Sequence, residues 1–217
     1  MLNKVTSINF NEDMFLPFHI TYINNSSYMK VRLMDLKGYT HIGVDGFLFQ
    51  KIYNLFSRRK KINRTSFDFT SNAPEFLRYI KENDLRACFI GGKESEISKF
   101  ENLMDSSEHK HTKLGYYSGY PLDQGFESWE AYFDHIDISK YDVVVLGLGA
   151  PLQEQIGMLI MNIYKDVSTV TCGGFISQCS INDGFNYYPS LINKLNMRWL
   201  YRIFRESHVL KRVIFDY

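Results

Sequence analysis

The sequence has few cysteines and no long apolar run. Its 217 residues include three cysteines, Cys88, Cys172 and Cys179, and none forms a C-x-x-C pair. An odd count without a framework is more typical of a reducing cytoplasm than of a secreted disulfide fold. No apolar stretch reaches the roughly 18 residues that span a bilayer, and the first residues lack the apolar core of a signal peptide. We therefore expect a cytoplasmic protein that touches a membrane without crossing it.

Charge and composition narrow the class of protein only slightly. The net charge is +1, so the overall charge gives no reason to expect a nucleic-acid partner. The chain is 45% hydrophobic and 23% charged, which is an ordinary globular composition with material for one sizeable core. We find no repeat, low-complexity tract or linker. We predict one α/β domain over residues 1–190 and a C-terminal helical appendage over residues 191–217.

Short apolar segments alternate with segments of helical spacing along the chain. Strands are predicted at residues 19–24, 40–44, 86–90, 113–117, 142–146 and 168–172. Helices are predicted at about 28–36, after 45, and at 74–83, 94–104, 126–136 and 152–164, and a long helical pattern begins near 189. Such alternation predicts a Rossmann-like, mainly parallel sheet that is flanked by helices.

Three of the predicted strands end in turns that contain two glycines. Ligands of open α/β sheets bind outside the carboxyl ends of the strands, where these turns would lie together. Glycine lets the backbone approach a ligand closely, and the helix that follows offers free N–H groups to a phosphate or diphosphate. For any single turn, a tight connection without a ligand is an equal alternative. The residues concerned are Gly91, Gly92, Gly147, Gly149, Pro151, Gly173 and Gly174.

One of these turns also resembles the start of the dinucleotide fingerprint G-x-G-x-x-G. Leu152 occupies the place of the third glycine, and the strand lies late in the chain. The P-loop pattern G-x-x-x-x-G-K-[ST] is absent. A nucleotide-binding oxidoreductase is therefore the weaker alternative.

The segment Val145-Leu-Gly-Leu-Gly-Ala-Pro-Leu-Gln-Glu154 resembles the G-x-G-x-P-x-Q-E motif of the WecG/TagA/CpsF glycosyltransferases. Other segments resemble motifs of this family in the family's order. They are Thr21–Asn24, Gly43–Gly46, Arg64–Ser71, Phe89–Lys93, Cys172–Gln178 and Arg198–Arg205. The resemblance covers nearly the whole chain, from about Thr21 to Arg212. The family adds sugars during the synthesis of enterobacterial common antigen, wall teichoic acid, capsule and exopolysaccharide.

The resemblance implies an inverting transfer of a sugar from a UDP-sugar to a polyprenyl-diphosphate-linked sugar, at the anionic inner face of the cytoplasmic membrane. It implies that Asp45 is the catalytic base, which takes the proton of the acceptor hydroxyl. The local sequence alone favours another role for Asp45, the N-cap of the next helix. A non-catalytic scaffold of a polysaccharide-synthesis complex is a further alternative. Family members also suggest that self-association or membrane docking completes the site, so a homo-oligomer is one expectation.

The remaining motif residues are expected to bind substrate. Arg64 would meet the charge of the diphosphate, and Asp68 would hold Arg64 or bond within the site. Gln153 and Glu154, at the start of a helix, would reach ribose or sugar hydroxyls. The predicted substrate-binding set is Thr21, Asn24, Arg64, Asp68, Gly91, Gly92, Gly147, Gly149, Pro151, Gln153, Glu154, Gly173, Gly174 and Gln178.

A metal site is not expected from the sequence. No D-x-D motif occurs, and His109-Lys-His111 has no second ligand cluster to accompany it. We therefore expect neither a metal nor another cofactor, and we expect backbone N–H groups and cationic side chains to bind the diphosphate instead.

The end of the chain predicts a basic amphipathic helix, with Trp199 on its apolar side. Its basic face would contact either the diphosphate of the acceptor or an anionic membrane. A helix with a solvated basic face is the alternative. The arginines assigned to this role are Arg198, Arg202, Arg205 and Arg212.

Overall fold

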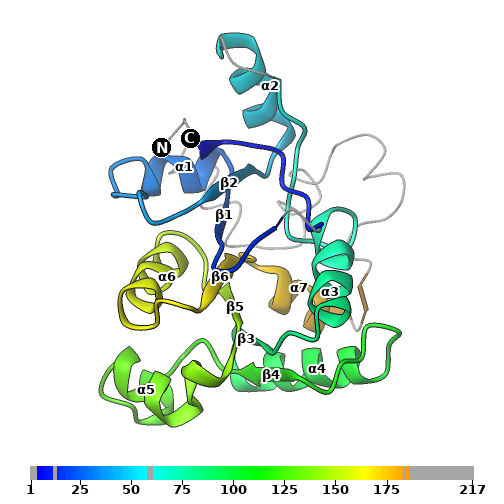
Figure 1. The fold of residues 1–217 in the computed structure, drawn as a ribbon, viewed down its shortest axis with the longest axis vertical. Coiled ribbons are helices and arrows are strands. Elements are labelled where there is room, and N and C mark those ends of the chain that lie inside the picture. Colours follow the sequence, from blue (N-terminus) through cyan, green and yellow to red (C-terminus); the bar gives the residue numbers. More distant parts are fainter. Residues whose placement is uncertain (1–3, 12–13, 58–60, 183, 186–217) are drawn as a thin grey trace.

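The structure, a computed structural model, describes residues 4–11, 14–57, 61–182 and 184–185 (Figure 1). Its centre is a six-stranded sheet in which all neighbouring strands are parallel, in the order β2-β1-β6-β5-β3-β4. The strands are β1 (His19–Ile23), β2 (His41–Val44), β3 (Ala87–Gly91), β4 (Leu114–Tyr117), β5 (Val143–Gly147) and β6 (Ser168–Thr171). This confirms the predicted Rossmann-like α/β fold.

Helices cover both faces of the sheet (Figure 1). They are α1 (Asn25–Val31), α2 (Phe47–Phe56), α3 (Asn72–Glu82), α4 (Glu94–Asp105), α5 (Trp129–Ile136), α6 (Leu152–Ile163) and α7 (Phe175–Asn182), with short 3-10 turns η2 (Leu122–Gln124) and η3 (Ile138–Lys140). Side chains alternate along β5: Val143 and Val145 join the core with α3, α4 and α7, whereas Val144 and Leu146 join the core with α5 and α6. This alternation explains why β5 reads as a continuous apolar run, since both of its faces are buried.

The chain reverses its direction of winding between β3 and β5. Helix α4 leads from β3 outward to β4, whereas α6 leads from β5 to β6 on the other side. Strands β3 and β5 are neighbours, and Gly91 at the end of β3 lies opposite Gly147 at the end of β5. Ligands of such sheets bind at the point where the strand order reverses.

Several element boundaries differ from the prediction. Helix α1 begins at Asn25, earlier than expected, because the Asn24 side chain and Ser27 form a capping box. Helix α5 begins at Trp129 rather than Phe126, after Ser128, whose side chain accepts a hydrogen bond from the N–H of Ala131. Within the part of the chain that is described, no helix is long and apolar enough to cross a membrane.

The predicted C-terminal appendage at residues 191–217 lies outside the described residues, together with Arg198, Arg202, Arg205 and Arg212. Its helical character and its proposed contacts stay predictions.

Candidate functional site

The carboxyl ends of five parallel strands gather most of the predicted site residues on one edge of the sheet. Asn24 follows β1, Asp45 follows β2, and glycine turns follow β3, β5 and β6. Arg64 and Asp68 reach this edge from the segment between α2 and α3, because the N–H of Thr65 donates to the carbonyl of Val44 (2.9 Å) and extends the end of β2. The structure therefore brings together residues that lie far apart in the sequence.

A charged cluster lies at the end of β2. The Nη2 atom of Arg64 lies 3.1 Å from Oδ1 of Asp45 and 3.4 Å from Oδ2 of Asp68. The same nitrogen donates to the hydroxyl of Ser66 (2.8 Å), which in turn donates to Oδ2 of Asp68 (2.6 Å). Burial disfavours the charged guanidinium, but the two carboxylates outweigh burial and raise the pKa of Arg64. Asp68 is held in place by Thr70, whose N–H donates to its Oδ1.

Asp45 is not the cap of the helix that follows it. The N-cap of α2 is Gly46, and no side chain forms a cap hydrogen bond there. This excludes the structural role that local sequence favoured for Asp45. Its side chain is 37% exposed, and its second oxygen, Oδ2, accepts no hydrogen bond from the described residues. The carboxylate is thus fixed through one oxygen by Arg64 and has the other available for a proton.

Two residues near this cluster were not in the predicted set. Ser66 bridges Arg64 and Asp68, and its position inside the Arg64–Ser71 motif was the available signal. The hydroxyl of Tyr22 is buried and has no hydrogen-bond partner among the described residues. Burial, then the charges of Glu75, Asp68 and Asp45, raise the pKa of Tyr22, so its phenol stays protonated. Nothing in the pattern of an apolar strand distinguishes Tyr22 from an ordinary core residue.

The glycines of the edge are of two kinds. At Gly91 an added Cβ would lie 2.6 Å from the carbonyl oxygen of Gly147, so this pair allows two backbones to pack closely. Gly149 and Gly173 have φ values of +72° and +56°, and an added Cβ would meet no atom within 4 Å. Gly149 and Gly173 therefore expose their backbone to open space. They do so in a left-handed conformation that costs other residues conformational free energy.

Gln153 and Glu154 lie behind the glycine turns rather than over them. Both side chains are buried, and Oε1 of Glu154 accepts hydrogen bonds from the hydroxyl of Thr21 (2.9 Å) and from Nε2 of Gln153 (3.0 Å). Thr171 donates to the same Thr21 hydroxyl. Gln153, Glu154 and Thr21 are therefore removed from solvent in this structure, and their contacts with a substrate stay predictions.

The buried network ties two turns together. Oε1 of Gln153 accepts a hydrogen bond from the N–H of Gly173 (3.1 Å), which joins the turn after β5 to the turn after β6. The Glu154 carboxylate has its second oxygen buried and unpartnered among the described residues. Desolvation raises the pKa of Glu154, although the hydrogen bonds from Gln153 and Thr21 oppose this. Tyr39 also donates to the backbone carbonyl of Glu154.

The three helices that start at the glycine edge differ in their first turns. Helix α4 carries Glu94 and Glu96, and the carboxylate of Glu96 accepts from the N–H of Lys93 (2.8 Å). Helix α7 has no acidic residue in its first turn, and in α6 the acidic residue Glu154 is turned inward. Because a helix N-terminus attracts an anion, the starts of α6 and α7 are better suited to a phosphate than the start of α4.

The other predicted residues take local roles. Oδ1 of Asn24 accepts from the N–H of Ser27 (3.0 Å) and caps α1, beside the end of β2. Gln178 lies in α7, and its Nε2 is 3.3 Å from the position that a Cβ on Gly174 would take. Both stay predicted substrate contacts.

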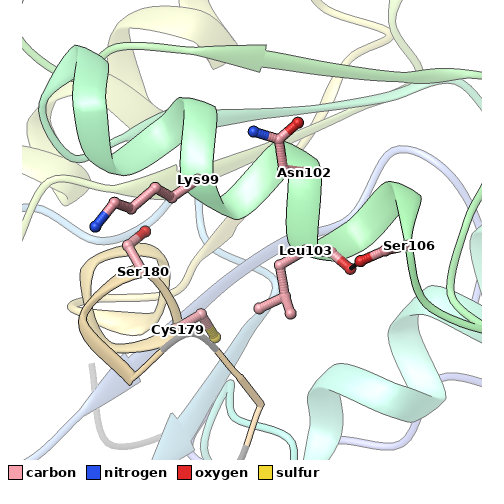
Figure 2. A pocket seen from close by; sticks show the side chains of 6 residues that line it. All are labelled: Lys99, Asn102, Leu103, Ser106, Cys179 and Ser180. Atoms are coloured by element: carbon pink, nitrogen blue, oxygen red, sulfur yellow. Dashed lines mark hydrogen bonds between the residues drawn. The ribbon is translucent and has the colours of Figure 1, made fainter.

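A hollow elsewhere on the surface lies between α4 and α7 (Figure 2). Its lining includes Lys99 and Asn102 from α4, Ser106 directly after α4, and Ser180 from α7. Helices that follow the strands run back toward the opposite edge of the sheet, so the later turns of α4 lie away from the glycine turns. The hollow contains none of the predicted site residues.

Among the described residues, no group of three or more His, Cys, Asp and Glu side chains is arranged to hold a metal ion. The expectation of a reaction without a metal stays a prediction.

An α/β fold whose ligand edge combines a charged cluster with open glycine turns is suited to bind a ligand that contains phosphate groups. Residues 17–217 match the model of the glycosyl transferase WecG/TagA/CpsF family. A relative from Shigella boydii, the UDP-Gal:alpha-D-GlcNAc-diphosphoundecaprenol beta-1,4-galactosyltransferase, is 34% identical over 204 residues, which cover 91% of this chain and 81% of the relative. The chain belongs to the WecG/TagA/CpsF family of glycosyltransferases.

Proposed function

We propose that this protein transfers a hexose from a UDP-sugar to a sugar that is linked through a diphosphate to a polyprenyl lipid, during the synthesis of a bacterial surface polysaccharide. The observation that carries the proposal is the partly exposed carboxylate of Asp45, which does not cap α2 and lies on the same sheet edge as the open glycine turns. The relative from Shigella boydii supports it, because its name gives UDP-galactose as donor and diphosphoundecaprenol-linked GlcNAc as acceptor.

In this proposal the diphosphate of the donor binds over the turns after β5 and β6. The open glycines Gly149 and Gly173 let the phosphates approach the backbone, and the starts of α6 and α7 supply N–H groups and a positive dipole end. Gln153 holds the two turns at a fixed spacing through the N–H of Gly173. These groups would stabilise the negative charge that the leaving UDP acquires.

Asp45 in this proposal removes the proton from the acceptor hydroxyl as that oxygen attacks the anomeric carbon. The bond from that carbon to the UDP oxygen breaks on the opposite face, so the configuration inverts. UDP-galactose is an α-glycoside and the relative's product is β-linked, which fits inversion. Arg64 fixes the Asp45 carboxylate from one side and leaves Oδ2 toward the acceptor.

We further propose that no metal takes part, and that the protein works at the anionic inner face of the cytoplasmic membrane. Arg64, whose pKa is raised by its carboxylate partners, supplies a permanent positive charge near the reacting groups. The four C-terminal arginines are proposed to add contacts to the acceptor diphosphate.

The proposal is tested by measuring UDP release with a panel of UDP-sugars, with UDP-galactose first, in the presence of EDTA. The acceptor is a short-chain lipid diphosphate that carries a single GlcNAc. We expect acceptor-dependent UDP release that survives EDTA and is lost in Asp45→Ala. If no donor is turned over and UDP does not bind, the proposal fails and a scaffold role replaces it.

A further inference from the structure

Helix α2 turns its apolar side outward. The exposed side chains are Phe47, Leu48, Ile52, Leu55 and Phe56, which we call the α2 apolar face. Leu55 and Phe56 are 76% and 78% exposed. Figure 1 shows α2 extending away from the sheet, at the top of the view. An apolar face of this kind on an exposed helix marks an interaction surface.

Hydrogen bonds on the inner side hold the helix in this orientation. Nε2 of Gln50 and Nδ2 of Asn54 both donate to the carbonyl of Ile62 (2.9 Å each), and the N–H of Ile62 donates to Oδ1 of Asn54 (2.9 Å). The ring of Phe49 packs against Tyr28 at a centroid distance of 5.3 Å. Gln50 and Asn54 thus form their hydrogen bonds on the inner side of α2, and this fixes the outward position of its apolar residues.

All charged residues in the sequence from Phe47 to Asn63, which contains the α2 apolar face, are basic. Lys51 lies on the outer side of α2, with its ammonium 5.1 Å from the ring centre of Phe47. The sequence then continues as Ser57-Arg-Arg-Lys-Lys61, and no Asp or Glu occurs between Gly46 and Arg64. Apolar residues beside clustered Lys and Arg suit the surface of a bilayer that contains anionic lipids.

The same charges argue against a second copy of the chain as the occupant. In a twofold dimer the same patch meets itself, so Lys51 on the outer side of α2 would approach the Lys51 of the other copy. Like charges at close range oppose such a contact, whereas anionic headgroups neutralise them.

We propose that the α2 apolar face seats on the surface of an anionic membrane. Helix α2 begins directly after Asp45 and Gly46, so this contact brings the proposed base close to the level of the lipid headgroups. The choice of a bilayer as partner rests on the proposed function, because an acceptor that is linked to a polyprenyl lipid is presented there.

The first test measures co-sedimentation of the full chain with vesicles of phosphatidylcholine, alone or mixed with phosphatidylglycerol. We compare wild type with Leu48→Gln/Ile52→Gln/Leu55→Gln and with a matched control, Leu122→Gln/Ile163→Gln/Ile181→Gln, which alters exposed aliphatic residues elsewhere. We expect wild type and control to bind the anionic vesicles, and the α2 variant to bind at least ten-fold more weakly. Equal binding by the α2 variant and wild type overturns the proposal.

Turnover distinguishes this proposal from the proposed function. With a water-soluble short-chain acceptor, the α2 variant is expected to match wild type, whereas with a polyprenyl acceptor in anionic vesicles it is expected to be slower. The vesicle-binding result decides the docking proposal even if neither acceptor supports turnover, in which case only the proposed function fails.

A second probe does not depend on loss of binding. The native cysteines Cys88, Cys172 and Cys179 are buried, so Leu55→Cys can be labelled with an environment-sensitive fluorophore, with Leu122→Cys as control. We expect anionic vesicles to shift the emission of the label at residue 55 to the blue and to leave the label at residue 122 unchanged. A label at residue 55 that is already shielded without vesicles overturns the proposal. Shielding that is lost on dilution would assign the face to a second copy, and shielding that persists would assign it to residues 186–217.

Discussion

Two parts of the ligand edge differ in the groups that they present, side chains in one and backbone in the other. At the ends of β1 and β2, charged side chains form the site: Arg64 is shared between Asp45 and Asp68. At the ends of β5 and β6 the open surface consists of backbone, and the one acidic residue there, Glu154, is buried. Neighbouring strands are about 4.8 Å apart, so β2 and β6 are separated by roughly 10 Å. In the proposed mechanism, proton transfer takes place at the first of these parts and diphosphate binding at the second.

The largest effect is expected from Asp45→Asn at the charged end. The amide keeps the shape of the side chain but cannot take the proton from the acceptor hydroxyl, so turnover should fall by about 10²–10⁴-fold. The affinity for UDP, measured by calorimetry, should remain that of wild type, because Asp45 lies away from the proposed diphosphate site. A variant that loses both UDP binding and turnover would contradict the assignment of proton transfer and diphosphate binding to different parts of the edge.

Arg64→Lys should reduce turnover less. A lysine keeps the charge but cannot maintain the contacts of the guanidinium with Asp45, Ser66 and Asp68 at once. Hydrogen bonds to charged groups are worth about 1.5–3 kcal/mol, which corresponds to roughly ten- to a hundred-fold in rate. Steady-state kinetics should place the loss in kcat for acceptor-dependent transfer. Unchanged kcat would show that Arg64 does not position the base.

Gly173→Ala probes the other end, and Gly125→Ala is its matched control. Both glycines have positive φ, +56° and +86°, and at both an added Cβ meets no atom within 4 Å. Each alanine should therefore cost a similar 1–2 kcal/mol or so of folding free energy, measured by urea unfolding. Only Gly173→Ala should weaken UDP binding, by roughly ten-fold for one lost contact. Equal UDP affinities in the two variants would argue against diphosphate binding at this turn.

Glu154→Gln should have the smallest effect, and its effect should depend on pH. Burial raises the pKa of Glu154 in the folded protein, so the folded state holds its proton more tightly than the unfolded state. The associated stability is fully present below the unfolded pKa and is lost as the pH rises through the folded pKa. The stability of wild type relative to Glu154→Gln should therefore decrease as the pH rises above about 4.3, the usual glutamate pKa. A difference that is constant with pH would show that Glu154 does not titrate differently on folding.

The sheet was largely predictable, and so was the gathering of the glycine turns at one of its edges, because strand ends marked by glycine pairs are local signals. The roles of individual residues were less so. Sequence could not distinguish the packed glycines Gly91 and Gly147 from the open ones, since this depends on which strands become neighbours. It also could not show that Glu154 turns inward to Thr21, because that contact joins residues 133 positions apart. The exposed side of α2 was read only as helical spacing, which does not say which side faces the core.

The central claim is that the donor's diphosphate binds over the turns after β5 and β6. Hydrogen–deuterium exchange of the wild-type protein with and without UDP tests it most directly. We predict slower exchange on UDP binding in the peptides that contain residues 147–155 and 173–178. We predict no change in residues 98–106, which include Lys99, Asn102, Leu103 and Ser106 from the lining of the hollow in Figure 2. Protection of residues 98–106 without protection of the two glycine turns would contradict the account.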